Sequence, residues 1–263
     1  MLAAVKEGDV KKVAEVIRQD PGFNVNMDHS GDGLGRTLLH SACLESHRSA
    51  VIPLLLAHPG IDVNVKNRHR STPFYYACAY GRDSCVRELL KDSRVKANEP
   101  VQSRHTPLWA AVATGHLEVI KWWIASGREL DLGTPGNDET DAIGEARRRD
   151  RTEVVTPLER FKENPGEIRH EVRVELGWYD EAAAARFALM VFVSDGLLQI
   201  KDVTSSTPAA RYYSIARNLP LELQMVLCFR QVGSAKEIIP GKDSEEGFKS
   251  LAKSLLWPSF FTS

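Results

Sequence analysis

The chain has 263 residues, which is enough for one large domain or two ordinary domains with their own cores. Hydrophobic residues make up 43% and charged residues 26%, which excludes a disordered or fibrous protein. Its 34 basic and 35 acidic side chains leave a formal net charge of −1. This charge excludes a global field that would attract nucleic acid or anionic membranes, so such partners would need a local patch.

The sequence predicts neither a secretion signal nor a membrane span. Met1–Gly8 lacks the long apolar core of a signal peptide, and the longest strongly apolar run, Phe187–Val193, is too short to cross a bilayer. The cysteines form no Cys-x-x-Cys pair, so we interpret them as small core residues in a reducing compartment. We therefore expect a cytoplasmic protein, with the nucleus as the alternative location. The cysteines are Cys43, Cys78, Cys85 and Cys228.

The first twenty residues predict a short helical pair. The small residues Ala3-Ala4 fit a first helix, and Val13 and Ile17 mark one face of a second helix. Asp20-Pro21 should end this second helix, because proline cannot continue it. A long loop follows at residues 28–35.

Two site motifs fail in the loop at residues 28–35. Asp28, Ser30 and Asp32 have the spacing of a calcium loop. The twelfth position of that loop would be Leu39, where calcium requires a bidentate carboxylate. The glycines of the loop lack the preceding strand and the Lys-Ser/Thr signature of a phosphate loop. We interpret the segment as a flexible loop tip.

A phrase that begins with threonine then recurs along the chain. Copies begin at Thr37, Thr72 and Thr106, with spacings of 35 and 34 residues, and a weaker copy begins at Thr140 after another 34. Each copy predicts a first helix, a turn and an apolar second helix. Pro53 lies inside the second helix of the first copy, so that helix should be kinked or should start late. A fixed period in this range is typical of a stacked-repeat solenoid.

The phrases resemble the ankyrin repeat, which opens a first helix with Thr-Pro-Leu-His and continues with two small residues, Gly-His and an apolar second helix. The likeness covers roughly residues 1–165 and is clearest in Thr106–Ile120. It implies an all-α, ankyrin-repeat solenoid in which each helix-turn-helix carries a finger loop. The first and last repeats are degenerate. The expected repeats span residues 1–35, 36–70, 71–104, 105–138 and 139–165.

Residues 166–263 predict a separate helical C-terminal domain. Asn164-Pro165-Gly166 should break the chain, and the repeat phrase is absent beyond it. We expect a helical bundle that caps the last repeat by covering its otherwise exposed apolar face. The expected helices cover residues 179–193, 208–219 and 221–232, with a last one that begins at an N-cap, Asp243, and runs to Leu256.

His40 is the side chain that most resembles a catalytic base. The family resemblance implies a structural role instead, in which this histidine hydrogen-bonds within the turn that opens the repeat. Tyr75 and Trp109 occupy its position in the next two copies. No Ser, Cys or carboxylate constellation converges on His40, so a general base would lack an oriented partner. We therefore expect no enzymatic activity, no cofactor and no metal.

The resemblance also implies where a partner would bind. Contact positions in this family lie on the finger just before the threonine and on the first helix seven and eight residues after it. Ser71, Ala79 and Ala113 occupy such positions, and Arg147 and Arg148 occupy those of the fifth copy. With the basic residues beside them, the predicted partner-binding residues are Arg36, Leu44, Glu45, Lys66, Arg68, His69, Arg70, Tyr80, Gln102, Ser103, Arg104, His105 and Thr114.

These positions predict a non-catalytic, monomeric scaffold that binds another protein. Lys66, Arg68, Arg70 and Arg104 add positive charge along two fingers that flank Tyr80, which suits an acidic segment with an aromatic or extended anchor. The alternative is a set of solvated finger tips. A nucleic acid partner is not expected, because the basic stretches are short, and no membrane partner is expected.

A second function remains open. Leu219-Pro220-Leu221-Glu222-Leu223 resembles the opening of F-box helices, which some ankyrin proteins carry near the C-terminus. This reading makes the chain a substrate-recognition adaptor of a cullin-type ubiquitin ligase. The competing interpretation is that these residues are buried in the bundle, because Pro followed by Glu is also good chemistry for a helix start.

Overall fold

The computed structural model describes residues 1–20, 22–31, 33–131, 141–195, 212, 215–216 and 218–256. Every regular element within these ranges is a helix, so the fold is all-α as the sequence predicts. The chain divides into two compact units, Met1–Val172 and Arg173–Ser263. None of the described helices has both the length and the apolar character needed to pass through a membrane.

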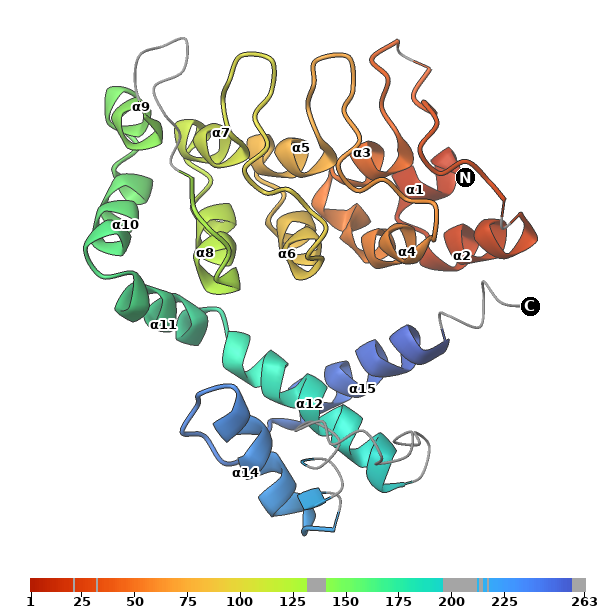
Figure 1. The fold of residues 1–263 in the computed structure, drawn as a ribbon, viewed down its shortest axis with the longest axis vertical. Coiled ribbons are helices and arrows are strands. Elements are labelled where there is room, and N and C mark those ends of the chain that lie inside the picture. Colours follow the sequence, from red (N-terminus) through yellow and green to blue (C-terminus); the bar gives the residue numbers. More distant parts are fainter. Residues whose placement is uncertain are drawn as a thin grey trace. The chain divides into compact units, whose positions relative to one another are not determined.

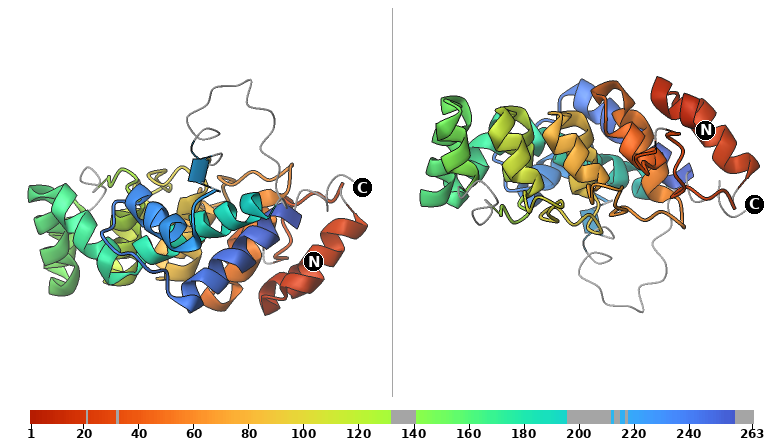
Figure 2. Two further views of the ribbon diagram at one scale, coloured as in Figure 1. Left: turned by 90° about the horizontal axis from the view of Figure 1, so that it is seen from below. Right: turned by 90° about the horizontal axis from the view of Figure 1, so that it is seen from above.

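The first unit is a stack of helical pairs. First helices lie in one row and second helices in another, and loops extend from the first row (Figure 1). Seen from above, the first helices follow one another in sequence order (Figure 2). This is the predicted solenoid. Its pairs are α1 (Leu2–Glu7) with α2 (Val10–Gln19); α3 (Leu38–Ala42) with the 3-10 helix η1 (Ser46–Val51) and α4 (Ile52–Ala57); α5 (Pro73–Ala79) with α6 (Asp83–Lys91); α7 (Pro107–Thr114) with α8 (Leu117–Ser126); and α9 (Ala142–Arg148) with α10 (Thr152–Glu163).

The Thr-Pro phrase starts a first helix because it meets the needs of a helix N-terminus. The hydroxyl groups of Thr72 and Thr106 accept hydrogen bonds from the backbone N–H groups of Tyr75 and Trp109, both at 3.1 Å. The proline after each threonine has a φ suited to the first helical turn and lacks only an N–H that the helix would leave unpaired. In the second repeat, α4 begins one residue before Pro53, after η1, so the predicted late start is confirmed.

The fifth repeat is offset by one residue from the sequence pattern. The N-cap of α9 is Asp141, whose carboxylate accepts a hydrogen bond from a first-turn N–H at 2.7 Å. Asp150 has a φ of 57° at the turn where the fourth repeat has Gly115 with a φ of 78°. The repeat therefore begins 35 residues after Thr106, because aspartate caps a helix as well as threonine does. The weak copy of the phrase was predicted to begin at Thr140, which is one position before the capping residue Asp141. Thr140 itself lies outside the described residues.

Polar side chains reach backward from each repeat to the one before it. Each lies near the turn between two helices and contacts a backbone carbonyl at or just beyond the end of the preceding first helix. Such carbonyls have no donor within their own helix, so these contacts satisfy them. Arg48 Nε donates to Lys6 O at 2.9 Å, Arg82 Nε donates to Leu44 O at 2.7 Å, and His116 Nε2 lies 3.3 Å from Ala79 O.

Asparagines at the bases of the fingers reach forward to the next repeat. Asn64 makes two bonds across one boundary: its Nδ2 donates to Arg94 O at 2.8 Å and its Oδ1 accepts from Lys96 N at 2.7 Å. Asn26 makes the same pair of bonds with Gly60 O and Asp62 N, at 2.7 and 2.9 Å, and Asn98 makes a longer bond of 3.4 Å to Glu129 O. Neighbouring repeats are thus joined by polar contacts as well as by apolar packing.

The cysteines behave as the sequence suggests. All four are buried free thiols. Burial raises the pKa of the Cys85 thiol to about 12 and that of the Cys228 thiol to about 11, and it raises the pKa values of Cys43 and Cys78 well above their usual range. The thiols therefore stay protonated and act as small apolar side chains.

The helix α11 (Pro165–Glu175) begins at the predicted chain break, Asn164-Pro165-Gly166. Ile168 and Val172 are buried, and Arg169 Nε donates to Ile124 O of α8 at 3.2 Å. The first part of α11 therefore belongs to the stack, and the first unit ends at Val172 rather than at residue 165. That the tail caps the stack stays a prediction.

The second unit contains α12 (Trp178–Ser194), α14 (Leu221–Gln231) and α15 (Gly241–Leu256). Its core is an apolar cluster around Phe187, Met190 and Phe229. The helices α12 and α15 approach closely at Gly247, where an added Cβ would lie 2.6 Å from the carbonyl oxygen of Ala184. No side chain larger than hydrogen fits there without a shift.

The last helix of the tail begins earlier than the sequence predicts. The last helix begins at Gly241, where Ser244 N donates to Pro240 O at 3.0 Å. Asp243 thus lies in the first turn and is not the N-cap, so that prediction was wrong: the helix already starts directly after Pro240. Most of the helix expected at residues 208–219 lies outside the described residues.

Candidate protein-binding site

The tips of the second and third finger loops have the same backbone structure. In the second finger, Asn67 N donates to Ser71 O at 3.1 Å and Arg70 N donates to Asn67 O at 2.9 Å. The third finger repeats both bonds, from Val101 N to His105 O at 3.1 Å and from Arg104 N to Val101 O at 3.0 Å. Arg70 and Arg104 have φ values of 58° and 68°. Two arginines therefore occupy the same left-handed position of consecutive fingers, a conformation that favours glycine.

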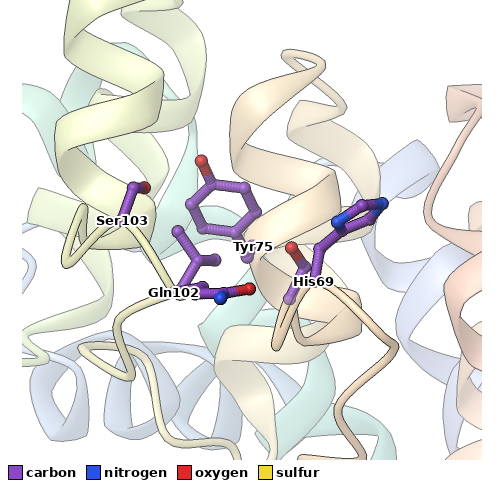
Figure 3. Close-up of a pocket in the computed structure, with 6 residues that line it drawn as sticks. His69, Tyr75, Gln102 and Ser103 are labelled. Carbon is purple, nitrogen blue, oxygen red and sulfur yellow. The ribbon is translucent and has the colours of Figure 1, made fainter.

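A groove of ≈ 580 Å³ lies between these two fingers. His69 and Ser71 line it from the second finger, and Val101, Gln102 and Ser103 line it from the third. Tyr75, from the first turn of α5, also lines it and lies between Gln102 and His69 (Figure 3). The structure thus brings three predicted residues, His69, Gln102 and Ser103, to one site.

The sequence prediction missed Tyr75 as a groove residue. Burial raises the pKa of its phenol, so Tyr75 keeps its proton and can donate a hydrogen bond. The available signal was its position, three residues after the threonine, where repeats two and four carry His40 and Trp109. We interpreted that position as structural because the family resemblance implies this role for His40.

For His40 itself, the structural interpretation is confirmed. Its ring is buried; Nδ1 accepts from the Thr37 N–H at 3.2 Å, and Nε2 lies 3.0 Å from Ser71 O. These partners place the ring proton on Nε2, which donates to Ser71 O. Burial lowers the pKa of His40 to about 4, so the ring is neutral near pH 7. The imidazole therefore ties α3 to the next finger.

The third-finger residue His105 packs on the first helix of the fourth repeat and lies outside the groove lining. Its ring stacks on Trp109 with the centroids 3.6 Å apart and an interplanar angle of 9°. Ser103 Oγ lies 3.1 Å from His105 Nδ1. His105 is half-buried and does not line the groove, so its predicted contact with a partner stays a prediction.

The remaining predicted residues surround the groove. Tyr80, at the end of α5, is 51% exposed, and its ring lies 5.7 Å from that of Tyr76. Lys66 forms an ion pair with Glu99 of the next finger. Glu45 is bound to Arg82 at 3.2 Å. Arg68, Arg70, Gln102, Arg104 and Thr114 are exposed, and Arg36 and Leu44 are half-buried.

Among the residues that the structure describes, no group of three or more His, Cys, Asp or Glu side chains is placed to hold a metal ion. The groove is lined by hydroxyl, amide and imidazole groups and by an aromatic ring, and the polar groups suit hydrogen bonding to a peptide backbone.

Comparison with known proteins agrees with the repeat architecture of the first unit. A family model described as ankyrin repeats (three copies) matches residues 1–100 and 51–134. SMC5-SMC6 complex localization factor protein 1 of Bos taurus is 32% identical over 139 residues, 52% of this chain and 13% of that protein. Ankyrin repeat and SOCS box protein 11 of Mus musculus is 34% identical over 96 residues, 36% of this chain and 28% of that protein.

A shorter relative is matched over most of its length. Putative ankyrin repeat protein FPV223 of fowlpox virus is 34% identical over 107 residues, 40% of this chain and 71% of the viral protein. The bovine protein is much longer, and the matched segment spans only 13% of it. The similarity to the longer relatives is therefore a similarity to one part of each.

Proposed function

The chain belongs to the ankyrin repeat family, and from this premise we propose that it is a non-catalytic scaffold that binds a segment of another protein. Ankyrin repeats bind other proteins, and the family is typically non-catalytic. The proposed binding surface is the face formed by the finger loops and the first helices, which we call the concave face. We place the interaction in the cytoplasm or nucleus, where buried free thiols such as those of this chain are common.

The groove between the second and third fingers is the observation that carries this proposal. Its polar groups come from loops whose tips are fixed by backbone hydrogen bonds, so binding there requires little ordering of the scaffold. Tyr75 adds an aromatic surface between His69 and Gln102 (Figure 3). Aromatic anchors in preformed sites carry much of the binding energy in protein interfaces.

The charges beside the groove favour an acidic segment, but fewer of them contribute than the sequence suggests. Lys66 is paired with Glu99, and the ion pair lowers the pKa of that carboxylate, with Arg70 adding to the effect. Arg68 and Arg104 are therefore the cations most available to a partner. Exposed charges of this kind mainly accelerate association and make it sensitive to salt.

The test begins with capture of a partner by the immobilised full chain and continues with titration against variants. Gln102→Arg places a long cation in the groove and should weaken binding about tenfold or more, as loss of an interface hot spot does. Gln19→Arg on α2, a similar change at an exposed position outside the concave face, is the control. A partner that binds the Gln102→Arg chain like wild type and fails to bind the control would contradict the proposal.

One observation supports the adaptor as a second candidate. At the start of α14, Leu221 is 55% exposed and Leu223 is 50% exposed. These two leucines are therefore not buried bundle positions, whereas Leu219 of the same segment is half-buried. Exposed leucines on a helix are available to a partner. A relative whose name contains a SOCS box adds weak support.

The adaptor candidate has its own test. The full chain should recover a cullin-linked adaptor protein, and Leu221→Ser with Leu223→Ser should abolish the recovery while the far-UV spectrum and melting stay unchanged. Recovery of such a subunit by the double variant at the wild-type level would exclude these leucines as the contact.

A further inference from the structure

The first and second fingers are joined by a backbone hydrogen bond. Arg68 N donates to Leu34 O at 3.0 Å across the space between the two fingers. Glycine at position 35 suits this close approach, because a Cβ on Gly35 would already lie 3.5 Å from Arg68 Cγ and 3.6 Å from Arg68 N. The bond pairs one polar backbone group of each finger and closes the space between them.

The same two positions recur one repeat later, at His69 and Gln102. Leu34 and His69 each lie three residues before a threonine of the repeat phrase, and Arg68 and Gln102 each lie four residues before one. The backbone is also the same, since each finger is closed by a bond to the residue before the threonine and has a positive φ one residue earlier. The closing bonds run from His29 N to Arg36 O, from Asn67 N to Ser71 O and from Val101 N to His105 O, and the residues with positive φ are Gly35, Arg70 and Arg104.

This equivalence gives the direction of two backbone groups. Arg68 N–H points to the finger before it, so Gln102 N–H points to the second finger. Leu34 C=O points to the finger after it, so His69 C=O points to the third finger. Both groups therefore face the space between the second and third fingers.

The corresponding bond is missing between the second and third fingers. Within the part of the chain that the structure describes, neither Gln102 N–H nor His69 C=O makes a hydrogen bond, to the other or to a third group. The groove of ≈ 580 Å³ lies here instead, and both residues line it. An unpaired N–H and an unpaired C=O that face one gap form a template for the backbone of another chain.

The spacing of the repeats suits one extended segment between the fingers. The first helices α5 and α7 pack side by side, and packed helices are about 8–10 Å apart. Extended chains pair at about 4.8 Å, so a single chain midway between two such fingers lies within pairing distance of both. Tyr75 lies between Gln102 and His69, so this segment also contacts the tyrosine ring (Figure 3).

From this geometry we propose that the groove recognises the main chain of an extended segment of another protein. Gln102 N–H donates to a carbonyl oxygen of the segment, and His69 C=O accepts from one of its N–H groups. The inference rests on the proposed function and deepens it, because it states how the partner is held in the same groove. Main-chain recognition requires a residue other than proline at the paired position and tolerates many side chains there.

The first experiment changes the backbone of the bound peptide. Random displayed peptides are selected on the immobilised full chain, and one selected peptide is titrated by fluorescence anisotropy. Each of its peptide bonds is then replaced in turn by an ester, which lacks the N–H. At one position the ester should weaken binding about tenfold, whereas alanine at that position should weaken it less than about threefold. A peptide in which no ester weakens binding more than the alanine at the same position would contradict the proposal.

The second experiment removes the donor of the protein. Because Arg104 N donates to Val101 O, Gln102 is the second residue of a β-turn, a position that favours proline. Gln102→Pro removes the N–H together with the side-chain amide, and Gln102→Ala, the matched control, removes the amide alone. The proline variant should bind the peptide about tenfold more weakly than the alanine variant, with the same melting temperature.

The outcomes separate this inference from the proposed function. If Gln102→Arg weakens binding and the proline variant binds as the alanine variant does, main-chain recognition is excluded and the groove stands as a site for side chains. If none of the three variants affects binding, both proposals fail. If NMR of the isotopically labelled peptide shows that it binds as a helix, the inference is overturned, since the backbone groups of a helix are bonded to one another.

Discussion

The stack and the tail unit are held together in different ways, although their described elements are all helices. In the stack, contacts recur at one-repeat intervals: Asn26 and Asn64 make the same two bonds across successive boundaries. In the tail unit, the described helices converge on one apolar cluster and one close crossing, at Gly247 and Ala184. A repeated contact has copies elsewhere, whereas the crossing has none among the described residues. A substitution should therefore destabilise mainly the adjacent repeats in the stack, whereas in the tail it should destabilise the whole unit.

The largest effect is expected at the helix crossing of the tail. Gly247→Ala should destabilise the second unit by about 3 kcal/mol, because the new Cβ meets backbone that cannot move without separating two helices. Hydrogen exchange measured by mass spectrometry should show faster exchange throughout α12 and α15 and unchanged exchange in the stack. Gly241→Ala is the matched control in α15, since its Cβ meets nothing within 4 Å.

A histidine contact with no copy in the next repeats should make the stack sensitive to acid. The folded-state pKa of His40 is about 4, below its usual value of 6.5, so the unfolded chain takes up the proton first as pH falls. The part of the free energy of unfolding that depends on His40 is fully present above about pH 6.5 and decreases as the pH falls toward 4. Between pH 7 and pH 5 the loss is about 2 kcal/mol. Urea unfolding at the two pH values measures the loss. The control is His40→Gln, in which this part of the pH dependence should vanish.

The asparagines that reach forward allow a graded test within the stack. Asn64→Ala removes two bonds of 2.8 and 2.7 Å across one boundary and should cost about 1.5 kcal/mol. Asn98→Ala removes a bond of 3.4 Å and should cost less than about half of that. Exchange should increase mainly at the boundary that is changed. Equal losses for the two variants would contradict the assignment of stability to these bonds.

The smallest effect is expected at the finger tips. Arg70→Gly should change the free energy of unfolding by less than about 0.5 kcal/mol, because glycine relieves the left-handed strain while it loses more entropy on folding. Arg70→Val should destabilise the chain by about 1 kcal/mol, since a β-branched residue fits that conformation poorly. Thermal melting of the two variants against wild type makes this comparison.

Much of the stack could be predicted from the sequence because its signals are local. Thr72 and Thr106, each followed by proline, predicted the helix starts, and Pro53 predicted the late start of α4. The start of the fifth repeat was harder to predict, because its threonine and its capping aspartate are adjacent. Asp141 was the available signal, because it restores the spacing of 35 residues seen between Thr37 and Thr72.

The groove and the ends of the units depend on contacts between residues that are far apart in the sequence, so no local sequence pattern predicts them. Tyr75 lines the groove only because the next finger folds beside it. The start of α11 belongs to the stack because Arg169 reaches a carbonyl of α8, 45 residues earlier in the sequence. In the tail, the close crossing at Gly247 depends on the backbone of another helix, so the glycine alone does not reveal it.

The backward-reaching side chains also bear on how the chain folds as it leaves the ribosome. N-terminal segments emerge first. When Arg48 or Arg82 emerges, its acceptor carbonyl in the preceding repeat is already present, so each new repeat can attach as soon as its second helix begins. The hydrogen-bond partners of Asn64, by contrast, appear about thirty residues later. Backward contacts therefore allow each repeat to dock during synthesis, and forward contacts close a boundary only after the following repeat has been made.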